Sequence, residues 1–259
     1  MAEYVHGGTD AREVARLEKQ AVFTAEQTFA SLGFAPGMRV LDLACGVGAT
    51  GGLLQRRFPG VDVVGLDLSA AQLGASRRNH PALPVVRADA TRLPFADATF
   101  DGVHCSWLLE HVPDPLGVLR EVRRVLAPGA WGHFIEVDNA TLALEPPSAA
   151  VTELMRRLNE AQRAAGGDPF IGRRVEQLFG DAGFAEVRVE RRALHGHEGE
   201  PRFFQAFIEE FAEIFEGLDE SLGDGALRLI DEASRAVRGL RQVPGSALRY
   251  TPALVHARR

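Results

Sequence analysis

Residues 40–51 read VLDLACGVGATG, and this stretch decides the fold. The apolar run around Asp42 predicts a buried strand, and the glycines after it predict a tight turn that leads into a helix. Gly46, Gly48 and Gly51 fit the spacing G-x-G-x-x-G, in which small residues allow a close approach of the backbone to a ligand. This spacing alone is weak evidence for any one ligand.

The position of Asp42 restricts the kinds of ligand that the glycine turn can bind. A carboxylate at the strand end, beneath the glycine turn, would repel the pyrophosphate of a dinucleotide and would suit a ligand with an ammonium group. The arrangement D-x-x-x-G-x-G resembles the first motif of the class I S-adenosylmethionine-dependent methyltransferases. Their cofactor carries an ammonium, a sulfonium and a ribose. The resemblance implies that Asp42, Ala44, Gly46 and Gly48 surround S-adenosylmethionine here.

Acidic residues also follow the next two predicted strands. Asp67 ends the second strand, where a carboxylate can accept hydrogen bonds from both ribose hydroxyls of NAD or of S-adenosylmethionine. Leu68 and Gln72 follow it and are expected beside the nucleoside and the methionine or ribose end. In the family, an acid and a small residue after the third strand contact the adenine. Asp89 and Ala90 match that pair, although a surface helix cap is the simpler interpretation of Asp89.

The most family-specific stretch is residues 93–112, LPFADATFDGVHCSWLLEHV. It resembles the "LPF…D-x-(S/T)-F-D" and "(L)-x-E-H-(V/I)" signature of the ubiquinone/menaquinone-type methyltransferases. In that family the end of the fourth strand offers a backbone carbonyl to the methionine ammonium, which falls near Ser106. His111 is the first candidate for a general base, since histidine titrates near neutral pH. It could instead order the loop. Glu136, at the end of the fifth strand, is the second candidate.

Alternating strands and helices predict an α/β fold with a mostly parallel, doubly wound sheet, and ligands of such sheets bind at the carboxyl ends of the strands. The resemblance implies a Rossmann-like sheet of seven strands in the order 3-2-1-4-5-7-6. The seventh, antiparallel strand is expected at residues 248–257. Pro252 is awkward within it and suggests an edge position or a bulge.

The whole chain, residues 1–259, is expected to form a single methyltransferase domain. Residues 1–35 are expected to form an N-terminal helical lid, and Tyr4 is expected to cap the cofactor. Residues 198–246 are expected to form a helical cap inserted between the sixth and seventh strands.

Four phenylalanines mark one face of a predicted cap helix, at Phe203, Phe207, Phe211 and Phe215. Their spacing is that of core packing in a helix, and part of the stripe could line an apolar pocket or join two subunits. An exposed stripe would make a homodimer plausible. The pair His195 and His197 lacks a third ligand in view, so loop or pocket lining is favoured over a metal site, and no metal is expected.

Composition restricts the partners. The chain has 259 residues, 46% of them apolar and 25% charged, and its net charge is −6. That charge disfavours nucleic acid, whose phosphates need a basic face. No apolar run reaches the length of a membrane helix, the N-terminus does not resemble a leader, and the two cysteines suggest no disulfide framework. A cytoplasmic enzyme acting on a small molecule is expected.

Three functions therefore compete. The first is methyl transfer from S-adenosylmethionine to a hydrophobic or aromatic acceptor, such as a secondary metabolite of natural product biosynthesis, with O- or C-methylation favoured. The second is an NAD(P)-dependent oxidoreductase, which the glycine spacing and Asp67 also allow. The third is a regulator that binds the cofactor without catalysis. The fold alone does not decide among them.

Overall fold

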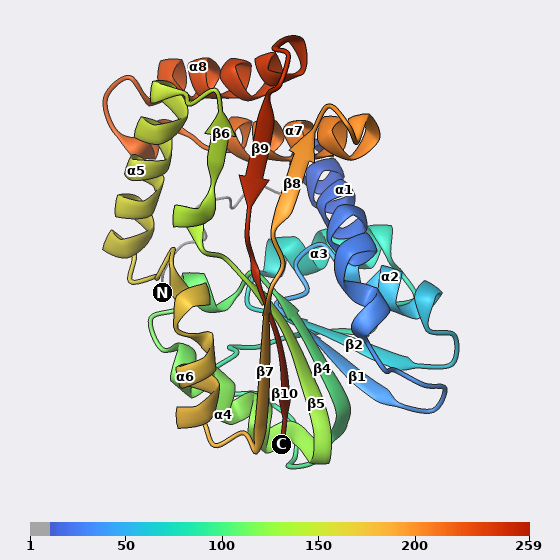
Figure 1. Ribbon diagram of the computed structural model, residues 1–259. Helices are drawn as coiled ribbons and strands as arrows, with labels where there is room; N and C mark the ends of the chain where they lie inside the picture. The colour runs from blue at the N-terminus through green and yellow to red at the C-terminus, as the bar shows by residue number, and fades with distance from the viewer. Residues whose placement is uncertain (1–10) are drawn as a thin grey trace.

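A computed structural model describes residues 11–259 (Figure 1), so the predicted contact of Tyr4 lies outside the described residues. The main sheet has seven strands, in the order β3-β2-β1-β4-β5-β10-β7. In that order they are Val85–Arg87, Asp62–Asp67, Arg39–Leu43, Phe100–Ser106, Leu126–Glu136, Ala253–Arg258 and Glu186–Arg191. All neighbours pair in parallel except β10, which is antiparallel to β5 and β7. The expected fold class and strand order are confirmed, because β7 and β10 are the sixth and seventh strands of the sheet.

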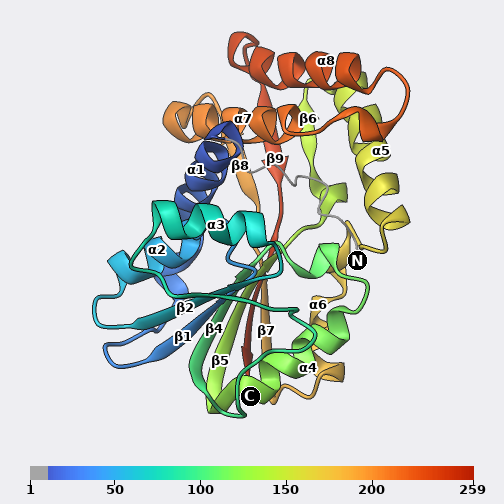
Figure 2. The same ribbon diagram turned by 180° about the vertical axis from the view of Figure 1, so that it is seen from behind.

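Helices cover both faces of this sheet (Figure 2). On one side lie α1 (Ala11–Thr28), α2 (Ala49–Arg57) and α3 (Ala70–Asn79), and on the other lie α4 (Pro115–Val125) and α6 (Val175–Asp181). The central strands β1, β2 and β4 are largely buried, as parallel strands covered by crossover helices are. In β1 every residue after Arg39 is buried. This packing fixes the carboxyl edge of the sheet, where the candidate site lies.

A cap stands on that edge. It contains a small antiparallel sheet, in the order β6-β9-β8 (Ala143–Glu145, Ala247–Tyr250 and Leu194–His197), together with α5 (Ala149–Ala164), α7 (Pro201–Glu216) and α8 (Ala226–Gly239). Figure 1 shows these elements gathered above the main sheet, with α1 reaching up beside α7. The cap therefore draws on more of the chain than the helices expected at 198–246. Among residues 11–259, no helix is both long and apolar enough to cross a membrane.

The expected strand at 248–257 is wrong in one respect, because it is two strands. β9 ends at Tyr250 in the cap sheet, and β10 begins at Ala253 in the main sheet. Pro252 lies in the break, where its missing N–H costs no ladder hydrogen bond. The N–H of Thr251 donates to Thr141 Oγ1 at 2.9 Å instead of to a strand. One continuous segment thus joins the cap to the sheet.

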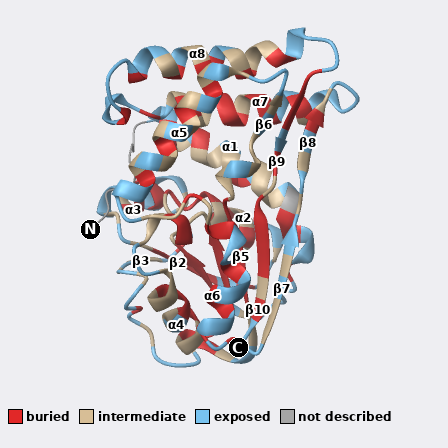
Figure 3. Cartoon of the chain, turned by 60° about the vertical axis from the view of Figure 1, so that its left-hand side comes forward, coloured by how far each residue is buried: buried red, intermediate tan, exposed pale blue. Residues whose placement is uncertain are grey.

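The aromatic stripe on α7 points inward. Phe207, Phe211 and Phe215 are buried, and Phe203 is half-buried and stacks on Phe23 of α1 at a centroid distance of 5.6 Å. Figure 3 shows how the inner surfaces of the cap helices are buried while their outer surfaces are exposed. The expectation of an exposed stripe is therefore wrong, and the stripe gives no support to a homodimer.

Candidate active site

The glycine turn after β1 has the shape that its residues demand. Gly46 and Gly48 adopt φ values of 51° and 82°, in the region that glycine occupies without strain. A Cβ on Gly48 would lie 2.3 Å from Ser76 Oγ, and a Cβ on Gly51 would lie 2.6 Å from Leu83 Cδ2. The first two glycines therefore set the turn, and Gly51 lets α2 pack closely.

Two other residues of the site are strained. Ala44 and Trp107 have φ values of 58° and 60°, which residues with a side chain rarely adopt. Ala44 follows β1 and Trp107 follows β4, so both lie at the carboxyl edge of neighbouring strands. Backbone strain of this kind is concentrated at binding and catalytic sites. It marks the junction of these two strands as the centre of the site.

Asp67 holds the glycine turn. Its Oδ2 accepts a hydrogen bond from the N–H of Gly46 at 2.9 Å, and its Oδ1 accepts one from the N–H of Ser69 at 2.8 Å. Burial raises the pKa of Asp67, and the hydrogen bonds from Ser69 and Gly46 oppose that effect. Each oxygen has a second lone pair, so the carboxylate can accept further hydrogen bonds from a ligand.

A first cavity, here called the donor cavity, lies at this turn. Six of the residues predicted to bind the cofactor line it: Asp42, Ala44, Gly46, Asp67, Gln72 and Ser106. Asp42 Oδ2 and Ser106 Oγ are both buried without a hydrogen-bond partner among the described residues. Buried polar atoms are normally satisfied, so these two fit the ammonium and hydroxyl groups of a bound molecule. S-Adenosylmethionine carries such groups, and the donor cavity therefore fits it.

Four other predicted cofactor residues do not line the donor cavity. Gly48 shapes the turn from behind, and Leu68 is 43% exposed. Asp89 is exposed, and its Oδ1 accepts hydrogen bonds from the N–H and Oγ1 of Thr91. Asp89 thus closes a local turn, and the simpler interpretation as a helix cap is wrong, because no helix begins there in the described chain. The adenine contact of Asp89 and Ala90 stays a prediction.

A second cavity, here called the acceptor cavity, lies between the main sheet and the cap. Most of its lining side chains are apolar, and they include Phe23, Ile135, Met155, Leu158, Leu194, Phe207, Phe211, Ile214, Phe215, Tyr250 and Leu254. Gln20, Thr24 and Trp107 line both cavities. The two cavities therefore meet at these three residues, which the sequence did not single out. Gln20 and Thr24 belong to no recognised motif. Trp107 lies inside the family-specific stretch 93–112, but no role was predicted for it.

His111 lines the acceptor cavity, as a general base must. Its Nε2 lies 3.5 Å from Glu110 Oε1, and Gln162 Nε2 lies 3.4 Å from its Nδ1. Gln162 also donates to Glu110 Oε2 at 2.7 Å. Glu110 is buried, so it can orient the imidazole and stabilise its protonated form. Gln162 comes from α5 in the cap, which sequence motifs alone could not bring here.

Glu136 occupies a different position. It is fully buried and lines neither cavity, and its Oε1 accepts hydrogen bonds from the N–H groups of Leu109 at 3.0 Å and Leu108 at 3.4 Å. These contacts hold the loop that carries Trp107 and His111. The geometry therefore favours a positioning role for Glu136 over the catalytic role expected from the sequence.

Glu136→Gln is expected to flatten the dependence of stability on pH. Burial, with repulsion from Glu110, raises the pKa of Glu136 from 4.5 to about 8. The folded protein therefore holds this proton more tightly than the unfolded chain, and the resulting stabilisation is complete below the unfolded pKa and is lost as the pH rises through the folded value. Urea unfolding of both proteins between about pH 5 and 8 measures this slope. Equal slopes would contradict the assignment.

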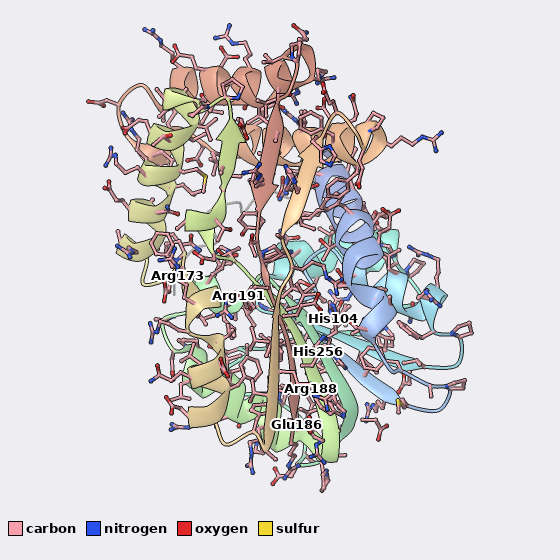
Figure 4. The ribbon with its side chains drawn as sticks, in the orientation of Figure 1. His104, Arg173, Glu186, Arg188, Arg191 and His256 are labelled. Atoms are coloured by element: carbon pink, nitrogen blue, oxygen red, sulfur yellow. The ribbon has the colours of Figure 1, made fainter. Side chains whose placement is uncertain are left out.

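Four of the described histidines outside the two cavities form two pairs. His195 and His197 lie on β8, not in a loop, with ring centroids 4.9 Å apart, and neither lines the acceptor cavity. His133 and His256 face each other across β5 and β10, with 2.6 Å between their Nδ1 atoms. Figure 4 shows His104 and His256 on the main sheet, below the cap. In the described part of the chain, no three metal-binding side chains converge.

Comparison with known proteins supports this site. Residues 41–134 match the family described as methyltransferase domain. A demethylmenaquinone methyltransferase from Beutenbergia cavernae is 45% identical over 114 residues, covering 44% of this chain and 46% of that protein. An uncharacterised transposon protein from Streptomyces fradiae is 34% identical over 186 residues, covering 68% of this chain and 53% of that protein. The chain thus spans about half the length of these relatives.

Solved structures share the fold. A phosphoethanolamine N-methyltransferase from Haemonchus contortus, in complex with S-adenosylmethionine, has a TM-score of 0.58 at 18% identity and is matched over 98% of this chain and 53% of that one. A chain from the complex of the Haloferax volcanii Trm112 methyltransferase activator with a methyltransferase has a TM-score of 0.63 at 18% identity, over 97% and 98%. Residues 41–134 thus match a methyltransferase domain, and the chain is similar in sequence to demethylmenaquinone methyltransferases over about half of their length and in fold to solved methyltransferases.

Proposed function

We propose that the protein transfers a methyl group from S-adenosylmethionine to a small molecule bound in the acceptor cavity. The observation that carries this proposal is the junction of the two cavities at Gln20, Thr24 and Trp107. The donor cavity, which holds the carboxylates under the glycine turn, shares these three residues with the largely apolar acceptor cavity. When bound, S-adenosylmethionine supplies a methyl group on its sulfonium, and the acceptor takes it by in-line displacement. The main task of the protein is to hold the two molecules in line.

Different residues of the donor cavity would bind different parts of the cofactor. Asp42 and Ser106 would hold the methionine ammonium, because their buried oxygens lack partners among the described residues. Asp67 would accept hydrogen bonds from the ribose hydroxyls while it keeps the turn in place. Gln72 faces the same cavity, and Trp107 closes it toward the acceptor.

The acceptor is a hydrophobic or aromatic small molecule. Six of the lining side chains are aromatic rings besides His111: Phe23, Trp107, Phe207, Phe211, Phe215 and Tyr250. The demethylmenaquinone methyltransferases bear names that suggest a quinone-like acceptor, but residues 41–134 supply only Trp107, Glu110 and His111 to this cavity. The cap, which has no part in that match, therefore selects the acceptor. Transfer to an oxygen or carbon is the form that His111 would assist.

His111→Ala is expected to lower the rate of methyl transfer about 10²- to 10⁴-fold, the usual contribution of a general base. The imidazole would take the proton that the acceptor loses, and Glu110 would stabilise the imidazolium. Turnover is measured as S-adenosylhomocysteine formed, with cofactor binding checked by titration. His195→Ala, outside the cavity, is the matched control. A rate unaffected by His111→Ala would assign the histidine to ordering of the loop.

Calorimetric titration tests the proposal against its alternatives. S-Adenosylhomocysteine is expected to bind with micromolar affinity, and NADH is expected not to bind. Binding of NADH alone would instead support the oxidoreductase that the glycine spacing also allows. A protein that binds the cofactor but adds no methyl mass to any compound of an aromatic metabolite library would support the regulator.

A further inference from the structure

The acceptor cavity contains a carboxyl group that methyl transfer to an apolar acceptor does not need. Glu210 lies on α7, lines the cavity and is 8% exposed. Its Oε1 has no hydrogen-bond partner among the described residues. Gln20 is its side-chain hydrogen-bond partner, and Gln20 also borders the donor cavity. Glu210 therefore lies one side chain away from the junction of the two cavities.

The cations near Glu210 are engaged elsewhere. Arg16 lies on α1 and lines the cavity, and its Nε and an Nη atom donate to the two oxygens of Glu13 at 2.8 and 2.7 Å. Lys19 pairs with Glu213 at 2.5 Å. Arg16 and Lys19 favour the charged form of Glu210, but burial outweighs them, and a buried carboxylate whose hydrogen-bond partner is an amide is costly unless a further positive group joins it. This imbalance points to a cation supplied by a ligand.

The other two charged side chains that line the cavity, Arg192 and Glu110, are partnered in a similar way to Arg16 and Glu210. Arg192, the second arginine that lines it, pairs with Glu190, which does not line it. Glu110, the second carboxylate, has Gln162 and His111 as its neighbours. The cations that line the cavity are thus paired with carboxylates outside it, whereas its own two carboxylates contact amides and an imidazole. A positive group of a ligand is therefore the group that these two carboxylates can pair with.

Aromatic rings surround the same place. Phe207 precedes Glu210 by one helical turn, and it stacks on Phe23 of α1 at 5.8 Å between centroids. Phe211 packs edge-on against Phe207 at 5.3 Å and against Tyr250 at 5.4 Å. Aromatic faces next to a carboxylate are the usual surroundings of a bound ammonium group.

We propose that Glu210, with Gln20 and the rings of Phe207 and Phe211, forms a subsite that binds a basic amine of the acceptor. The proposal deepens the proposed function, on which it rests. The amine docks at Glu210, on the side of α7, while the methyl-accepting atom lies at the junction beside Trp107 and His111. Burial raises the pKa of Glu210 to about 7. The positive charge of Arg16 and the hydrogen bond from Gln20 oppose this rise. Of the two more weakly acting neighbours, Glu213 raises the pKa and Lys19 lowers it. The carboxylate that binds the amine thus forms as the pH rises through neutrality.

Matched probe pairs test this subsite. Phenethylamine and 2-phenylethanol, and 1-naphthylmethylamine and 1-naphthylmethanol, differ chiefly in charge, and their binding is followed by ligand-observed NMR with S-adenosylhomocysteine at saturation. The amines are expected to bind at least about tenfold tighter than the alcohols, from the ion pair and the cation–π contact. The preference is expected to grow between pH 6 and 8, since Glu210 ionises there.

Glu210→Gln keeps the shape of the side chain and removes its charge, so the amine preference and its pH dependence are expected to disappear. Glu209→Gln, next to Glu210 on α7 but outside the cavity and paired with Arg238 of α8, is the matched control and is expected to keep both. Equal binding of amines and alcohols, no binding of either, or a preference that survives in Glu210→Gln would overturn the proposal. Titration with S-adenosylhomocysteine runs in parallel. If the parent protein binds S-adenosylhomocysteine but shows no amine preference, the subsite alone is rejected, whereas a parent protein that does not bind S-adenosylhomocysteine rejects the proposed function.

Discussion

Asp67→Asn is expected to weaken binding of S-adenosylhomocysteine by about 100-fold or more. Two hydrogen bonds from ribose hydroxyls to a charged acceptor contribute about 1.5 kcal/mol or more each, and about 1.4 kcal/mol corresponds to a factor of ten. An asparagine NH₂ would also face the N–H of Gly46 or of Ser69, which now donate to the two carboxylate oxygens. Because the NH₂ group and the backbone N–H are both donors, one of the two hydrogen bonds would be lost and the glycine turn would shift. Calorimetric titration measures the affinity.

Asp62→Asn provides the control for this experiment. Asp62 begins the same strand at the opposite edge of the sheet, its side chain is 62% exposed, and its ion pair with Arg39 is long, at 3.4 Å. An exposed pair of this kind contributes little to stability. We expect the affinity of Asp62→Asn to match that of the parent protein. If Asp67→Asn binds S-adenosylhomocysteine with unchanged affinity, the proposed hydrogen bonds between Asp67 and the ribose hydroxyls are rejected.

Gly48→Ala is expected to lower the free energy of unfolding by about 2 to 4 kcal/mol, as the sum of backbone strain and overpacking. The residue has a φ of 82°, and the new Cβ would lie 2.3 Å from Ser76 Oγ and 3.2 Å from Leu83 Cδ2. Both neighbours are buried, so neither can move into solvent. The same shift would distort the turn over the donor cavity. Urea unfolding gives the stability, and titration gives the affinity for S-adenosylhomocysteine.

Two further variants separate the causes. Gly180→Ala lies in α6, where a Cβ meets nothing within 4 Å, and is expected to be neutral or slightly stabilising. Ser76→Ala removes the hydroxyl that Gly48→Ala would strike, so the double variant is expected to recover part of the loss. If Gly48→Ala and Gly180→Ala have the same free energy of unfolding, close packing of the turn is not the reason for glycine at position 48.

The cap shows where motifs stop being informative. The stripe from Phe203 to Phe215 predicted a helix, and α7 covers it. Its periodicity is the same for a face that packs on a core, lines a cavity or joins a partner, so the direction of that face could not be decided. Only the packing of α1 against α7 turns the stripe inward and brings Gln20 beside Glu210.

The role of Glu136 illustrates the same limit. Its place at the end of β5 was predicted, and an acid at the carboxyl edge of a sheet is a reasonable candidate for catalysis. Whether such a side chain faces the cavity or the neighbouring loop depends on that loop, which comes from another part of the chain. In the structure Glu136 accepts hydrogen bonds from Leu108 and Leu109, and it serves the loop.

The sequence by itself determined the mostly parallel, doubly wound sheet and the glycine turn, and the resemblance that its motifs carry implied the strand order and most of the six residues that line the donor cavity. These features depend on local patterns: apolar strands, turn glycines, and acids placed at strand ends. The tertiary structure alone decided the acceptor cavity, because its walls come from α1, the loop after β4 and the cap. The groups that meet there are far apart in the chain, as Glu110 and Gln162 are, and long-range packing brings them together.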